Sequence, residues 1–176
     1  GRASSQLAEV LSERPDDLDL RMLAGQLKLA VGDFETAARH FQHVLLLSRQ
    51  GVNIPNLPEV EARRSMALLA LGRGEDAVDA METAVRALPE SLELIWAHQM
   101  RLAIRERDTD LEKAEAREQI MLDALYDLSD RLPDDPRVET YIGTTYNFRQ
   151  RHSEAVEAFE RAAALAEDKE NASVWL

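Results

Sequence analysis

The sequence predicts an all-α fold built from helix hairpins, and three observations carry this prediction. Hydrophobic residues make up 45% of the 176-residue chain but aromatic residues only 5%, so Ala, Leu, Val and Ile supply the apolar content, which favours helices over an aromatic-rich β core. No stretch alternates apolar and polar residues for long enough to form a strand. Helix-favouring segments also stop at proline-containing and aspartate-containing turns, as at residues 14–17 and 132–136.

The apolar periodicity predicts ten helices, at 3–14, 17–31, 34–48, 58–71, 74–88, 91–106, 110–131, 136–149, 152–166 and from about 170. Three helix starts carry a side chain that can cap by accepting a backbone N–H: Asp17, Ser91 and Asp135. Thr109 with Glu112 is typical of a capping box at the start of the helix over 110–131. Gly32 and Gly72 are expected to end helices in the left-handed conformation.

The predicted helices repeat in pairs with a period of 34 residues. Pro55 and Pro89 are 34 residues apart, as are Met121 and Ala155, and two insertions of 6 and 10 residues interrupt the period. The predicted organisation is one array: a second helix of a partial repeat at 3–16, four repeats at 17–57, 58–91, 92–135 and 136–169, and the start of a further repeat at 170–176. We expect the 10-residue insertion to lengthen the helix over 110–131 by about two turns.

The segment "LAGQLKLAVGDFETAARHFQHVL" resembles the tetratricopeptide repeat (TPR). Gly25 takes the small crossing position, Gly32 the turn, Phe34 the start of the second helix, Ala37 the small contact and Phe41 the aromatic position. The last repeat matches through Gly143, Tyr146, Ala155, Phe159 and Ala162. The resemblance covers residues 3–176 and implies a right-handed α-solenoid in which stacking of helix pairs buries the core.

The two middle repeats depart further from the pattern. The second repeat keeps Gly72, Ala77, Ala84 and Pro89 but has Met81 at the aromatic position. The third keeps Pro133, has Leu125 at the aromatic position and lacks the turn glycine.

Both chain ends are expected to expose apolar faces, because neither carries the polar capping element that solenoids need. The residues concerned are Leu7, Val10, Leu11, Val174, Trp175 and Leu176. We therefore expect the chain to be a piece of a longer array, with self-association possible through these ends.

Composition and motifs disfavour several classes of function. The formal net charge is −12, and a field of that sign repels nucleic acid and anionic lipid. No apolar run is long enough for membrane insertion. With no cysteines, disulfides and Cys-ligated zinc are excluded, and the cytoplasm and the periplasm fit equally well. His40 and His43 lie one turn apart without a third ligand, and no catalytic motif is present, so we expect no enzyme activity, metal or cofactor.

A partner-binding groove is the first candidate site, because the resemblance implies that the first helices of the repeats line a concave surface. Carrying that register over places these residues in the groove: Met22, Gln26, Leu29, Ala62, Met66, Leu69, Trp96, Met100, Thr140, Thr144 and Asn147. Some family members clamp a terminal carboxylate with Lys, Asn and Arg, but Met22, Ala62 and Trp96 stand where such residues belong. The expected surface is an apolar, Met-containing trough for a protein or peptide. The same methionines are also compatible with core positions, and Trp96 with a packing position between helices.

An acidic ridge is the second candidate. Residues 106–135 contain eleven acidic and four basic residues, and we expect the lengthened helix to present Glu112, Glu115, Glu118 and Asp123. A ridge of this kind would suit a basic partner, although a solvated helix face explains most charge runs.

The sequence therefore predicts a non-catalytic scaffold for protein-protein interaction that binds a partner protein or peptide in its concave groove, and the acidic ridge would suit a partner with basic residues. Two alternatives remain open. One is a periplasmic array of an exopolysaccharide-export or envelope-assembly machine, and the other is a regulatory array attached to an enzyme domain.

Overall fold

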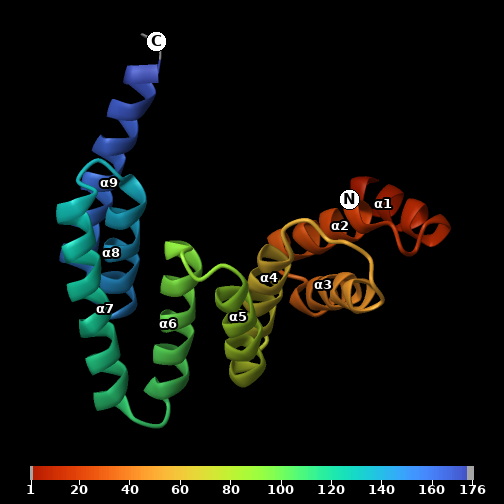
Figure 1. The fold of residues 1–176 in the computed structure, drawn as a ribbon, viewed down its shortest axis with the longest axis horizontal. Coiled ribbons are helices and arrows are strands. Elements are labelled where there is room, and N and C mark those ends of the chain that lie inside the picture. The colour runs from red at the N-terminus through yellow and green to blue at the C-terminus, as the bar shows by residue number, and fades with distance from the viewer. Residues whose placement is uncertain (1, 174–176) are drawn as a thin grey trace. The chain divides into compact units, whose positions relative to one another are not determined.

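The computed structural model describes the backbone of residues 2–173 and the side chains of residue 7 and residues 9–167. Every element in this range is an α-helix (Figure 1), so the predicted all-α solenoid class is confirmed. The helices are α1 (Arg2–Glu13), α2 (Leu18–Ala30), α3 (Phe34–Arg49), α4 (Leu57–Ala70), α5 (Gly74–Ala87), α6 (Leu92–Arg107), α7 (Leu111–Arg131), α8 (Pro136–Phe148) and α9 (His152–Ser173). They form two compact units, Gly1–Arg105 and Glu106–Leu176.

In the first unit, helix hairpins stack on one another. Helix α2 packs on α3, α3 on α4, and α4 on α5, while α1 lies against α2. A continuous core runs through α3 and α4 and contains Phe41, Val44, Val60 and Ala67, all with no exposed surface. In the second unit α8 packs on both α7 and α9.

Close crossing of the two helices in a pair depends on glycine, as the sequence predicts. A Cβ atom added to Gly25 would lie 2.6 Å from Cε1 of Phe41, and one added to Gly143 would lie 2.8 Å from Cδ1 of Phe159. Each aromatic ring occupies the space left by the missing side chain. The same glycine–phenylalanine contact therefore holds α2 against α3 and α8 against α9. The two phenylalanines differ in burial, since Phe41 is fully buried and Phe159 is 39% exposed.

The α4–α5 hairpin uses serine where the other two use glycine, which the sequence analysis did not identify. Ser65 is fully buried and its hydroxyl donates to the backbone oxygen of Ala77 at 2.6 Å. The same hydroxyl accepts from Nε of Arg101, whose Nη1 donates to Ala97 O at 2.8 Å. Burial lowers the pKa of Arg101 to about 10. A polar contact thus joins α4, α5 and α6.

Helix starts are capped largely as predicted. Asp17 accepts from the backbone N of Leu20 and Asp135 from that of Arg137, and Ser91 Oγ lies 3.4 Å from the backbone N of Leu94. These side chains satisfy backbone N–H groups that the first turn of a helix leaves unpaired.

The predicted Thr109–Glu112 capping box is wrong. The cap is Asp110, whose carboxylate accepts from the backbone N of Lys113 at 3.0 Å. Thr109 instead donates its hydroxyl back to Glu106 O at 3.2 Å. The charged carboxylate is the stronger acceptor, and it shifts the helix start by one residue.

The same tight turn joins the two helices of three hairpins. Gly32 and Gly72 have φ values of 79° and 73°, which confirms the expected left-handed conformation. Gln150 occupies the equivalent turn with a φ of 59°, and Gly32, Gly72 and Gln150 each donate from their backbone N to the carbonyl three residues earlier. A side chain in this conformation costs about 1–2 kcal/mol, which glycine avoids.

Replacing Gln150 with glycine is therefore expected to raise the free energy of unfolding by about 0.5–1 kcal/mol, because the relief of strain exceeds the extra entropy of glycine in the unfolded chain. Chemical denaturation would measure this change. The matched variant Gly72→Gln should lower stability by a similar amount. A destabilised Gln150→Gly protein would contradict this account of the turn.

The chain ends depart in part from expectation. Leu11, expected to be exposed, is buried, Leu7 is half-buried, and only Val10 of the three N-terminal residues is exposed. The expected helix end at residue 166 and new start near 170 are wrong, since α9 continues to Ser173. The predicted exposure of residues 174–176 lies outside the described residues.

Candidate functional site

A pocket of about 270 Å³ opens where the start of α4, the end of α5 and the start of α6 meet in the first unit. Its lining residues are Glu59, Ala62, Arg63, Met66, Leu88, Ser91, Glu93 and Leu94. Ala62 and Met66 belong to the predicted groove. Sequence reasoning missed four lining residues: Arg63, Leu88, Ser91 and Leu94. The turn at Pro89 would have marked the place where the last two of these helices converge.

The apolar part of this α4–α6 pocket continues from the protein core. Leu94 is buried in a cluster with Met81 and Ala84, against which Ala62 also packs. Met66 and Leu88 sit above this floor with 51% and 50% of their surfaces exposed. Methionine adapts its shape to different contacts, so the pocket combines a fixed floor with an adaptable wall.

The rim of the pocket is mainly acidic. Glu59 lies in the first turn of α4 and Glu93 in the first turn of α6, where the helix dipole favours negative charge. Glu59 pairs with Arg63 at 2.6 Å, whereas Glu93 has no ion-pair partner within 4.0 Å among the described residues. One carboxylate is thus left available for a basic group.

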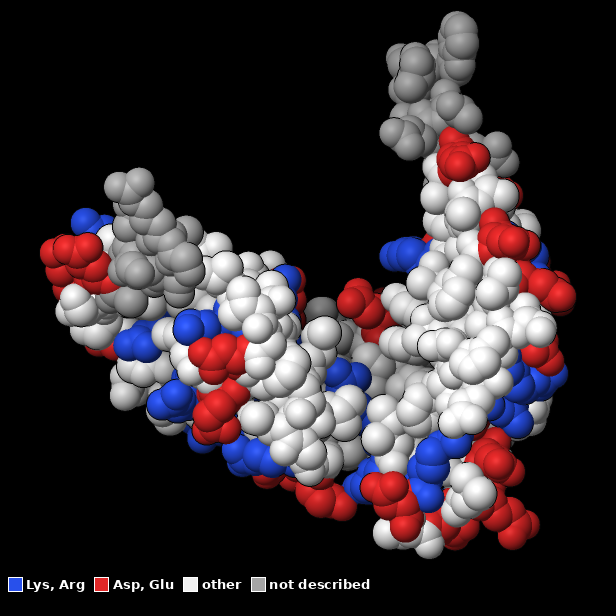
Figure 2. Space-filling view, turned by 180° about the vertical axis from the view of Figure 1, so that it is seen from behind, with Lys and Arg blue, Asp and Glu red and all other residues white. Residues whose placement is uncertain are grey.

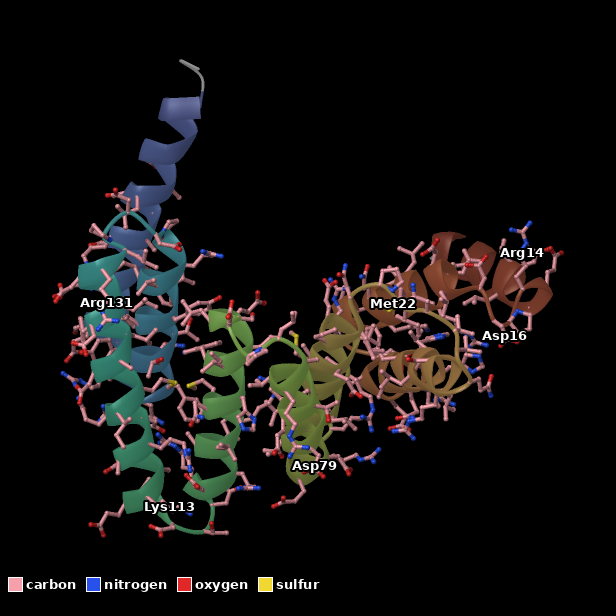
Figure 3. The ribbon with its side chains drawn as sticks, viewed as in Figure 1. Arg14, Asp16, Met22, Asp79, Lys113 and Arg131 are labelled. Atoms are coloured by element: carbon pink, nitrogen blue, oxygen red, sulfur yellow. The ribbon has the colours of Figure 1, made fainter. Side chains whose placement is uncertain are left out.

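Three other predicted groove residues of the first unit pack against the hydrophobic core. Met22, labelled in Figure 3, and Leu29 pack against the α3–α4 core, and Leu69 packs against the cluster of Leu68, Ala77 and Ala80. Gln26 and Trp96 are half-buried.

The prediction for Met100 is wrong, because Met100 is 6% exposed and belongs to the core. It lies three residues before Ala103, which is fully buried. One turn of helix places both on the same inward face of α6. The weak match of the third repeat left the register of this helix open, and the register decides which residues point inward.

The predicted polar groove residues of the second unit bond within their own segment. The hydroxyl of Thr140 donates to Pro136 O and that of Thr144 to Thr140 O, both at 2.8 Å. Asn147 Oδ1 lies 3.2 Å from a ring nitrogen of His152. These side chains have local partners, so the second unit offers a weaker case for a polar binding surface.

Helix α7 has 21 residues, against 16 in α3 and 14 in α5, so it exceeds these two second helices as predicted, whereas α9 with 22 residues does not fit the prediction. Glu112, Glu115 and Asp123 are exposed on α7, but Glu118 is fully buried, so its prediction as a ridge residue is wrong. Glu118 shares the inner stripe of α7 with Ala114, Met121, Leu122 and Leu125.

Arginines neutralise part of the acidic segment. Glu118 accepts from Arg107 at 2.6 Å, and Arg149 lies 3.6 Å away. Arg117 holds Glu106 through two bonds of 2.7 and 2.8 Å, which lower the pKa of that carboxyl to about 2. On the face of each unit drawn in Figure 2, acidic and basic side chains lie interspersed, without one continuous acidic field.

Metal and membrane sites find no support in the described residues. Within residues 2–173 no helix is both long and apolar enough to cross a bilayer. The described side chains also include no group of three or more His, Asp or Glu residues that could hold a metal ion.

Comparison with known proteins identifies the fold. No family model and no curated protein matches the chain. A crystal structure of MamA is similar over 96% of this chain and 90% of that one, with a TM-score of 0.56 and 16% identity. The structure of MamA 41-end from Desulfovibrio magneticus RS-1 is similar with a TM-score of 0.57 and 21% identity, over 95% of this chain and 85% of that one. YrrB is described as a TPR protein with an unusual peptide-binding site. Its crystal structure is similar with a TM-score of 0.53 and 18% identity, over 95% of this chain and 78% of that one.

At these identities the similarity establishes a fold and not a partner. The chain has a TPR-like fold of helix hairpins, as the sequence resemblance predicts.

Proposed function

We propose that this chain is a non-catalytic scaffold that binds a segment of a partner protein in the α4–α6 pocket. The observation that carries the proposal is the exposed side chain of Met66 above a fixed apolar floor, with the unpaired carboxylate of Glu93 on the rim. Apolar contact supplies affinity in such a site, and complementary charge supplies specificity.

The partner segment is expected to combine an aliphatic side chain with a lysine or arginine close to it in sequence. The aliphatic group would cover Met66 and Leu88, and the basic group would reach Glu93. A volume of about 270 Å³ holds only a few side chains, so this pocket would anchor a short motif within a longer contact surface. The peptide-binding site named for YrrB supports this class of partner by analogy of fold alone.

Selection from a displayed peptide library tests the proposal without a known partner. Peptides retained by the wild-type protein should be enriched in an aliphatic residue flanked by Lys or Arg, and Met66→Glu should weaken their binding at least about tenfold, because it places a charge in the apolar contact. Leu23→Glu is the matched control, since Leu23 is 53% exposed on α2 and does not line the pocket.

Both variants change an exposed residue, so both should retain the stability of the wild type within about 0.5 kcal/mol. Equal loss of binding in both variants, or enriched peptides without the basic residue, would place the binding surface elsewhere.

A further inference from the structure

A second cavity, separate from the α4–α6 pocket, lies among α1, α2 and α3 and has a volume of about 390 Å³. Its apolar lining comes from Leu7 and Leu11 of α1 and from Ala24 and Leu27 of α2. Leu11 and Ala24 are buried, and Leu7 and Leu27 are half-buried. The size and the apolar lining are those of a site for a small molecule.

Cationic side chains gather at one side of this cavity. Arg21 and Lys28 line it together with the polar residues Ser12, Thr36 and His40. Arg21, Thr36 and His40 also line an adjoining hollow of about 320 Å³, whose remaining residues are Arg39 and His43. Burial first, and then the nearby Arg21, Lys28, Arg39 and His43, lower the pKa of His40. A lowered pKa keeps His40 neutral, so the positive charge at this side of the cavity comes from Arg21, Lys28 and Arg39, in a chain whose formal net charge is −12.

Only part of this positive charge is neutralised within the protein. Lys28 pairs with Asp33 at 3.0 Å, and His43 pairs at 2.8 Å with Asp16, which lies in the turn between α1 and α2 (Figure 3). Arg21 and Arg39 have no carboxylate within 4.0 Å among the described residues. Arg21 donates to the backbone of Pro15 and lies 3.4 Å from His40, while Arg39 donates to Thr36.

The cations also stand where the repeat pattern has aromatic residues. That pattern places one aromatic four residues before the crossing glycine and a tyrosine three residues after it. Around Gly25 these positions are Arg21 and Lys28, whereas around Gly143 they are Glu139 and Tyr146, so only the first hairpin has a cation at both. Packing alone would favour the aromatic side chains, because half-buried cations lose hydration.

We propose that the cavity binds a small amphipathic monocarboxylate, an aliphatic acid of about eight carbons, with its chain against Leu11, Ala24 and Leu27. Its carboxylate would lie between Arg21 and the Thr36–His40 edge, where guanidinium, hydroxyl and ring N–H groups can donate to it.

An NMR titration of the ¹⁵N-labelled chain tests this proposal with three probes. Sodium octanoate should produce saturable shifts confined to α1, α2 and α3 in the low-millimolar range. Octylammonium has the same chain and the opposite charge, and it should bind at least about tenfold more weakly. Acetate lacks the chain and should not saturate the site. Equal affinity for octanoate and octylammonium, or shifts spread over the whole chain, would overturn the proposal without any mutation.

Variants locate the carboxylate contact. Arg21→Gln should weaken octanoate binding about tenfold, and Arg39→Gln should weaken it by a smaller factor, because Arg39 lines only the adjoining hollow. Arg21→Gln also removes the hydrogen bond to Pro15 and could therefore disturb the turn between α1 and α2. Arg39→Gln then tests the carboxylate contact by itself, since the described contact of Arg39 is with Thr36. Arg73→Gln removes an equal charge from the α4–α5 turn and should leave the affinity unchanged. Affinity unchanged in both Arg21→Gln and Arg39→Gln would refute the site.

Discussion

Replacing Phe41 with alanine is expected to lower the free energy of unfolding by about 3–5 kcal/mol. The ring has no exposed surface, fills the space above Gly25 and belongs to the core that joins α3 to α4. Its removal leaves a cavity between two hairpins that cannot collapse, because both helix backbones are fixed by their own hydrogen bonds. Urea unfolding followed by circular dichroism would measure the loss, and hydrogen exchange in α3 and α4 would locate it.

Phe159→Ala is the matched control for this variant. Phe159 lies 16 residues after its crossing glycine, as Phe41 does, and contacts that glycine in the same way. Since 39% of Phe159 is exposed, its truncation removes less buried surface and should cost less than about 2 kcal/mol. Equal losses for the two variants would mean that the glycine contact, and not the stacking of hairpins, determines the stability at this position.

Much of the fold could be predicted because a few residues have no alternative role. Gly25 must be small where a phenyl ring lies against it, and Gly32 must adopt a positive φ. Such positions recur with the repeat, so period and pattern together identify the hairpins. Gln150 and Ser65 escaped prediction because each fills a glycine position with another residue, and only the geometry shows that the turn and the crossing are unchanged.

The candidate site was less accessible to sequence reasoning, because it depends on which face of each helix points inward. Met66 is exposed while Met100 is buried, although each lies on the first helix of its repeat, Met66 on α4 and Met100 on α6. The third repeat lacks the turn glycine that would have fixed its register. The α1–α2–α3 cavity could not be predicted either, since its lining depends on how α1 rests on α2.

Glu118 shows most clearly how the register of a helix decides whether a residue is exposed or buried. A carboxylate expected on an exposed ridge is instead fully buried between Arg107 and Arg149, and Arg107 also stacks 4.6 Å from the ring centre of Phe148. These contacts join the end of α6, the middle of α7 and the end of α8 within the second unit.

Glu118→Ala is expected to lower the free energy of unfolding by about 1–3 kcal/mol, because it removes a fully buried carboxylate and leaves the half-buried guanidinium groups of Arg107 and Arg149 without their counter-charge. Glu118→Gln keeps an oxygen that can accept from Arg107 and should cost less than the alanine variant. Glu115→Ala, on the exposed face of the same helix, should change stability by no more than about 0.5 kcal/mol. Urea unfolding of the three variants, with hydrogen exchange in α7 and α8, would rank them. If Glu118→Ala proved as stable as Glu115→Ala, the buried ion pairs of Glu118 would contribute nothing measurable to stability. Glu118 would then again be a candidate for the acidic ridge with Glu112, Glu115 and Asp123.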